Sequence, residues 1–116
     1  MQVLAVSPLP DTPSAAAAAF HADWLPQARA LLNPPRAGED LVIAFDAADY
    51  THTGWRLAAV QMLAREHAPA RVNAVSGGDA AARAAALPYL ETADGITGQY
   101  LPLDDAGAGS VVKVPE

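Results

Sequence analysis

The sequence predicts an α/β fold, an open parallel sheet of four strands with helices between them. Short apolar runs of strand length alternate with longer segments whose apolar residues recur at helical spacing. The run at residues 41–45 is apolar throughout, which is typical of a strand covered on both faces and therefore of a parallel sheet. Because strands joined by helices tend to lie side by side, we expect the sheet order 1-2-3-4.

Prolines delimit the first strand and the first helix. Residues 1–7 form an apolar run that Pro8 and Pro10 close. A helix is expected from Pro13, a residue suited to the first helical position, to about residue 32. Pro26 lacks a backbone donor and should kink this helix.

The remaining elements continue the alternation. Three further runs predict the other strands: 41–45, 71–75 and 99–103. Helices are expected over about residues 54–67 and after Asp79, which is a suitable N-cap. Pro102 indicates an edge position for the last strand. Residues 111–114 form either a short fifth strand or a tail, and residues 1–116 are expected to form a single domain.

Composition excludes several classes of function. The chain carries 7 basic and 13 acidic side chains, a net charge of −6, so neither nucleic acid nor an anionic membrane is an expected partner. It contains no cysteine, which excludes thiol catalysis and cysteine-ligated metals. No apolar run reaches the ~20 residues of a membrane span, and no basic segment precedes the alanine run at 15–19. We therefore expect a cytoplasmic protein.

The helix expected over residues 54–67 carries two apolar stripes when drawn at ~100° per residue. One stripe consists of Leu57, Val60 and Ala64. The other consists of Trp55, Ala58, Ala59, Met62 and Leu63, and polar residues including Arg56 separate the two. A helix between a sheet and water needs only one stripe, so the second predicts a neighbouring helix or another subunit. Simple exposure of an alanine-rich face is the alternative.

Two runs in the second half of the chain are distinctive. Residues 63–78 read LAREHAPARVNAVSGG, and residues 96–104 read ITGQYLPLD. Together they resemble the end of the fifth long helix, the sixth strand and the last strand of short-chain dehydrogenases/reductases. Residues 57–60 are similar to that family's helix bearing the catalytic lysine. The resemblance is clear over residues 55–105 and collinear over 1–45.

The resemblance implies the second half of a Rossmann-like fold. The family's left-handed last crossover would place the third helix on the face opposite the first two. No glycine precedes Gly38, so the glycine-rich dinucleotide loop cannot form here. The family's catalytic tyrosine, and the lysine four residues after it, are also absent. Asp49 aligns with the tyrosine. The nearby Tyr50 has Gly54 four residues after it, and the only lysine in the chain is Lys113. We expect no catalytic residue of the family's type, no cofactor and no metal.

The leading hypothesis is a non-catalytic assembly or regulatory module. In the resembling family, two long helices of each subunit build an intersubunit four-helix bundle. The corresponding helices here supply the interface candidates: Phe20, Trp24, Trp55, Ala59, Met62 and Leu63. We expect a homodimer, or a hetero-oligomer with a related full-length reductase. The first strand, apolar and free of charge, would be an unprotected edge unless it is paired or covered.

The alternative hypothesis is a nucleotide-binding or acyl-CoA-binding protein, or an atypical enzyme, that uses the carboxyl ends of the strands. The candidate residues at this edge are Asp46, Asp49, Tyr50, His52, Gly77, Gly78 and Asp79. An aspartate with His52 could form an acid/base couple, and the two glycines could hold a phosphate. The structural alternative is that Asp49 and Thr53 are turn and cap residues, Tyr50 packs its ring and His52 is exposed.

Overall fold

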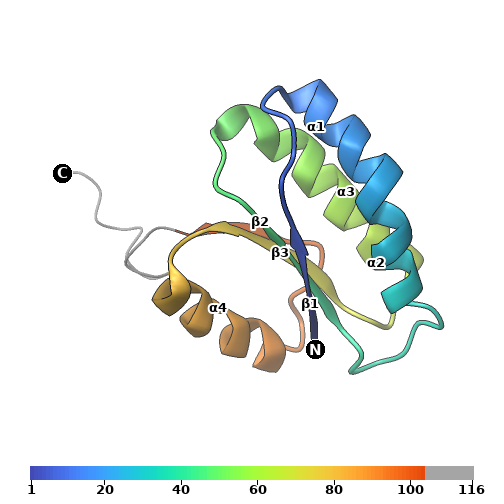
Figure 1. Ribbon diagram of the computed structural model, residues 1–116. Coiled ribbons are helices and arrows are strands. Elements are labelled where there is room, and N and C mark those ends of the chain that lie inside the picture. The colour runs from blue at the N-terminus through green and yellow to red at the C-terminus, as the bar shows by residue number, and fades with distance from the viewer. Residues whose placement is uncertain (104–116) are drawn as a thin grey trace.

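Four parallel strands form one open sheet in the order β1-β2-β3-β4, in a computed structural model that describes residues 1–103 (Figure 1). The strands are β1 (Gln2–Val6), β2 (Leu41–Phe45), β3 (Val72–Gly77) and β4 (Tyr100–Leu103). Each strand pairs in parallel with its sequence neighbour, with Leu4 opposite Ile43 and Ile43 opposite Ala74. The predicted fold class and strand order are confirmed. The possible strand at 111–114 lies outside the described residues.

Helices cover both faces of this sheet (Figure 1). One face carries α1 (Pro13–Ala19), the π-helical turn η1 (Phe20–Trp24), α2 (Leu25–Leu31) and α3 (Thr53–Glu66), the last preceded by the 3-10 turn η2 (Tyr50–His52). The other face carries α4 (Ala80–Thr92). Because the strands advance in one direction across the sheet, the crossover through α4 has the opposite hand to the other two. The expected placement of the third helix is therefore confirmed.

The helix distortion that Pro26 predicts is present, and it lies in the turn before this proline. In a regular α-helix the proline ring would clash with the carbonyl group of Ala22. The chain instead widens into η1, in which the backbone N–H of Leu25 donates to the carbonyl of Phe20, five residues earlier. Pro26 then occupies the first turn of α2, where no N–H donor is needed.

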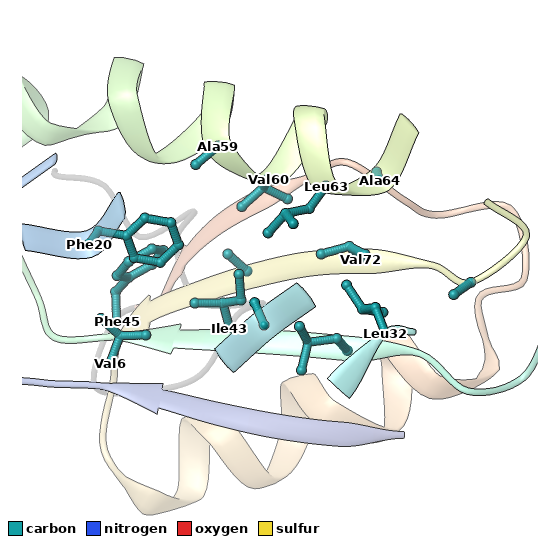
Figure 2. Packing of buried hydrophobic residues seen from close by; sticks show 14 residues of the cluster. Val6, Phe20, Leu32, Ile43, Phe45, Ala59, Val60, Leu63, Ala64 and Val72 are labelled. Atoms are coloured by element: carbon teal, nitrogen blue, oxygen red, sulfur yellow. The ribbon is translucent and has the colours of Figure 1, made fainter. Parts of the chain in front are cut away.

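The sheet separates two apolar cores. Every residue of β2 is buried: Leu41, Ile43 and Phe45 face α1 to α3, whereas Val42 and Ala44 face α4. Figure 2 shows the larger core, in which side chains of α3 and the sheet meet Phe20 from η1 and Leu32 from the end of α2. The continuous apolar run of β2 follows directly from this burial on both sides.

The prediction of two separate stripes on α3 is wrong, because the helix buries one continuous arc. The buried residues of α3 are Arg56, Ala59, Val60, Leu63 and Ala64. They come from both predicted stripes, and Arg56, assigned to the polar boundary, lies near the centre of the arc. Arginine side chains usually face water, but the guanidinium of Arg56 has hydrogen-bond partners inside the fold.

The same packing changes the set of interface candidates. Phe20, Ala59 and Leu63 are completely buried inside the chain's own core and cannot reach a partner. Trp24 and Trp55 are partly buried against that core. Phe20 and Phe45 each lie within 6 Å of the Trp55 ring, measured between centroids (5.5 and 5.6 Å). Of the six candidates, only Met62 exposes much of its side chain, 38%.

A buried ion pair fastens the amino end of the sheet to α4. Asp40 precedes β2 and Arg71 precedes β3; Arg71 Nη2 lies 2.7 Å and Nε 3.0 Å from Asp40 Oδ2. The backbone N–H of Arg71 also donates to Asp40 Oδ1 at 2.8 Å. The guanidinium further donates to the backbone carbonyls of Leu90, Glu91 and Ala93, at the end of α4. The carbonyls in the last turn of a helix have no partner within the helix, so Arg71 satisfies those of Leu90 and Glu91.

We expect Asp40→Ala to lower the free energy of unfolding by about 3–5 kcal/mol, because it leaves the Arg71 charge buried without its counterion. Urea unfolding followed by far-UV circular dichroism measures this change. The control is Glu39→Ala, which removes the exposed Arg36–Glu39 pair (3.6 Å) and should cost at most about 1 kcal/mol. Equal small losses for both variants would contradict the role assigned to Asp40.

Candidate functional site

A cavity of about 380 Å³ opens at the carboxyl ends of β1 and β2. Its walls come from the end of β1, the loop before α1, the loop after β2 and the first turns of α3. The polar residues that line it are Asp11, Asp46, Asp49, His52 and Arg56. The structure therefore brings three of the predicted edge residues, Asp46, Asp49 and His52, into one site and adds Asp11 and Arg56.

Arg56 is the buried cationic wall of this cavity, with 3% of the residue exposed. Its Nη1 donates to the backbone carbonyl of Asp46 and to the Tyr100 hydroxyl, each at 3.0 Å. Its Cζ lies 4.4 Å from the centroid of the Phe45 ring, a cation–π contact. Its Nε is buried without a hydrogen-bond partner. Among residues 1–103, no carboxylate lies within ion-pair distance of this guanidinium.

A short chain of hydroxyl groups continues from Arg56 into the sheet. Tyr100 on β4 accepts from Arg56 and donates to Ser76 Oγ on β3 at 3.0 Å. No local pattern links Arg56 to Tyr100, because 44 residues separate them. The signal that could have identified Arg56 is its spacing from Ala59, Val60 and Leu63, which places it on the buried face.

His52 is held through both ring nitrogens, and the expectation that it is exposed is wrong, since only 6% of it is accessible. Trp55 Nε1 donates to Nδ1 at 3.1 Å, so Nδ1 is the acceptor. Nε2 therefore carries the proton and donates to the carbonyl oxygen of Asp11 at 2.9 Å. The ring bonds to neither Asp46 nor Asp49, so the predicted acid/base couple is not formed. His52 instead fastens the loop before α1 to α3.

Asp49 caps η2, as the structural alternative predicted. Its Oδ1 accepts from the hydroxyl and from the backbone N–H of Thr51. The Thr51 hydroxyl, followed by the N–H group, holds the pKa of the Asp49 carboxyl below its ordinary value. Asp46 accepts from the Ser7 hydroxyl. Tyr50 is 85% exposed, so the expectation that its ring packs is wrong.

Gly77, Gly78 and Asp79 form the connection from β3 to α4 and do not line the cavity. Gly78 has φ +76°, and a Cβ there would come within 2.9 Å of the Leu103 Cβ. Asp79 accepts from the backbone N–H of Ala82 at 2.8 Å and caps α4, as predicted. Packing and turn geometry account for all three residues.

Buried polar groups of the two distinctive runs hold β4 against β3. The Asn73 amide donates to the Ile96 carbonyl and accepts from the Gln99 N–H, both at 3.0 Å. The Val72 N–H donates to the Thr97 hydroxyl at 3.0 Å, and its carbonyl accepts from the Gly98 N–H at 2.7 Å. These residues therefore fix the loop that leads into β4.

Two features typical of other classes of protein are not found in the part of the chain that the structure describes. No group of three or more histidine, aspartate or glutamate side chains is placed to hold a metal ion. None of the helices formed by residues 1–103 has the length and apolar character needed to cross a membrane.

Comparison with known proteins gives one match. A family model described as SDR-like, short chain dehydrogenase-like protein, matches residues 4–103. The matched segment contains the whole of β2 to β4 and the polar groups that hold β4 in place. No significant match is found among curated proteins or among solved structures.

We expect Thr51→Val to raise the pKa of Asp49 toward the ordinary value of an aspartate, because the main bond that favours the ionised carboxylate is lost. In the wild type, the stabilisation from this cap is present above the ordinary pKa and disappears as the pH falls through the lowered one. A ¹³C NMR titration of the Asp49 carboxyl measures the shift. Thr53→Val is the control and should leave this pKa unchanged; a rise in both variants would contradict the assignment.

Proposed function

The chain belongs to the short chain dehydrogenase-like family, and on this premise we propose that it is a non-catalytic member that assembles with a second copy of itself through β1. The absence of the family's catalytic tyrosine and lysine supports a non-catalytic role. Asp49 stands at the tyrosine position and accepts hydrogen bonds as a cap. His52, the nearest group with acid/base chemistry, uses both ring nitrogens to hold the fold. These structural roles of Asp49 and His52 support a non-catalytic member of the family.

The observation that carries the assembly proposal is the outer edge of β1. The Gln2 N–H donates inward to the Asp40 carbonyl at 2.8 Å. Since backbone groups alternate in direction along a strand, those of Val3 and Ala5 point away from β2. Within the described residues no strand pairs with this edge. The Val3 side chain is 48% exposed and Ala5 is also exposed, on the sheet face that α4 covers elsewhere.

A second copy of the chain fits this edge better than an unlike surface. The chain has a net charge of −6, so two copies repel wherever their carboxylates meet, but residues 2–6 carry no charged side chain. Antiparallel pairing of β1 with β1 about a twofold axis would satisfy the outward N–H and carbonyl groups of Val3 and Ala5 in both copies. It would also place their exposed apolar side chains in cross-strand contact.

A second candidate function is the binding of a small molecule in the cavity at the carboxyl ends of β1 and β2. The observation that favours it is Arg56, a buried guanidinium on the cavity wall with an unpartnered Nε. A buried cation on the wall of a cavity favours the binding of a small molecule over contact with another protein. The two functions are compatible, because one uses the outer edge of β1 and the other uses its carboxyl end.

We expect the wild-type chain to sediment as a dimer at micromolar concentration and Ala5→Pro to sediment as a monomer. Proline at this position removes an N–H that points outward, so the bonds between β1 and β2 remain and the melting temperature should change little. Analytical ultracentrifugation gives the mass, and circular dichroism verifies the fold.

Ala5→Ser, which keeps the N–H, is the matched control and should remain dimeric. Met62→Glu tests the helical face expected from the sequence. A monomeric wild type, or a dimeric Ala5→Pro, would overturn assembly through β1. If only Met62→Glu dissociates the dimer, the interface lies on α3 and not on β1. If β1 pairs with a full-length reductase and not with a second copy, the protein is a hetero-oligomer and the homodimer proposal is wrong.

A further inference from the structure

We propose that the cavity at the carboxyl ends of β1 and β2 binds a small zwitterion of the α-amino acid type, with its carboxylate on Arg56 and its ammonium group at the acidic mouth. This inference is independent of dimerisation. It concerns the chemical class of the ligand and rests on three observations: the unused donors of Arg56, the carboxylates around the mouth and the size of the cavity.

Arg56 supplies the anion-binding side. A guanidinium has five N–H donors in a rigid fork. The two hydrogen bonds that it makes within the described residues both start from Nη1. Nε has no partner, and Nε with Nη2 forms the edge that binds a carboxylate through two parallel hydrogen bonds. The donors of Arg56 that are not used within the described residues are those of this carboxylate-binding edge.

The buried charge of Arg56 gives an energetic reason for a bound anion. A guanidinium taken out of water is stable only when it is paired or fully hydrogen-bonded. The ring of Phe45 and two neutral oxygens compensate part of its charge, and no carboxylate of residues 1–103 completes the pairing. At the other end of the sheet, Arg71 shows complete pairing, with Asp40 at 2.7 Å. The carboxylate of a ligand would give Arg56 the counterion that Arg71 already has.

The mouth of the cavity supplies the cation-binding side. Asp11, Asp46 and Asp49 line it, and all three residues are exposed. The hydrogen bonds from Thr51 keep Asp49 ionised to lower pH than an ordinary aspartate. A ligand with anionic groups alone, such as a phosphate ester, would be repelled by these carboxylates on its way to Arg56. An ammonium group on the same molecule converts that repulsion into attraction.

The volume of the cavity limits the size of the ligand. Its 380 Å³ is near the lower end of the range of about 300–1,000 Å³ for small-molecule sites. A dinucleotide or an acyl-CoA would extend far beyond it, and both carry phosphates. A compact amino acid fits both the volume and the charges.

L-Norvaline is a suitable probe because each of its charged groups can be removed separately. Pentanoate lacks the ammonium group and butylamine lacks the carboxylate. We expect L-norvaline to bind at least about tenfold more tightly than either analogue, equivalent to about 1.4 kcal/mol. Isothermal titration calorimetry on the full chain gives the affinities. The Trp55 indole N–H resonance in a ¹H–¹⁵N NMR spectrum reports on the site, because this group donates to His52 on the cavity wall.

Two variants test the two ends of the site. Arg56→Gln should abolish binding of L-norvaline. If this variant fails to fold, Asp49→Asn decides, because Asn also serves as an N-cap and keeps the turn. It should weaken binding of L-norvaline about threefold or more and leave binding of pentanoate equal or tighter. Asp23→Asn, an exposed acid outside the cavity, is the matched control and should change neither affinity.

The outcomes separate this inference from the broader candidate of small-molecule binding. Pentanoate or inorganic phosphate binding as tightly as L-norvaline would overturn the zwitterion while retaining a ligand site at Arg56. No shift of the Trp55 indole resonance with any of the probes at millimolar concentration would overturn both. Unchanged L-norvaline affinity in Asp49→Asn would overturn the role of the acidic mouth.

Discussion

The Asp40–Arg71 ion pair fixes the starting points of β2 and β3 and the end of α4, and most of the fold depends on these three points. Asp40 lies just before β2, Arg71 lies just before β3, and the remaining donors of Arg71 take the last carbonyls of α4. α4 lies on the opposite face of the sheet from α3. The pair therefore ties the end of α4 to the amino ends of β2 and β3.

Arg71, which is partly buried, and Arg56, which is buried, mark a structural end and an open end of the sheet. Arg71, at the amino ends of the strands, has a carboxylate and three helix carbonyls as partners. Arg56, at the carboxyl ends, has a backbone carbonyl and a phenol, and it borders a cavity. A parallel sheet binds ligands at its carboxyl ends, so the incompletely paired arginine lies where a ligand can reach it.

Much of this fold could be predicted because its determinants are local. The apolar run of β2, the proline at the start of α1 and the capping aspartates Asp49 and Asp79 each act within a few residues. The burial of His52 could not be predicted, because the partners that permit it are distant in sequence. The His52 ring, for example, donates to the carbonyl of Asp11, 41 residues away. The candidate site could also be predicted only in part. Topology placed it at the carboxyl ends of the strands, but the position of the Arg56 guanidinium depends on contacts with Tyr100 and Phe45.

The two distinctive runs of the sequence, residues 63–78 and 96–104, lie outside the lining of the candidate site. The motifs that carry the resemblance are used to hold β4 on β3, through Asn73, Thr97 and Gly98. These contacts preserve the sheet whatever the protein does. The carboxyl ends of β1 and β2 instead carry the residues that line the cavity, and β1 belongs to both the cavity and the outer edge of the sheet. Pairing of that edge would restrain the strand whose last residue, Val6, forms part of the cavity wall.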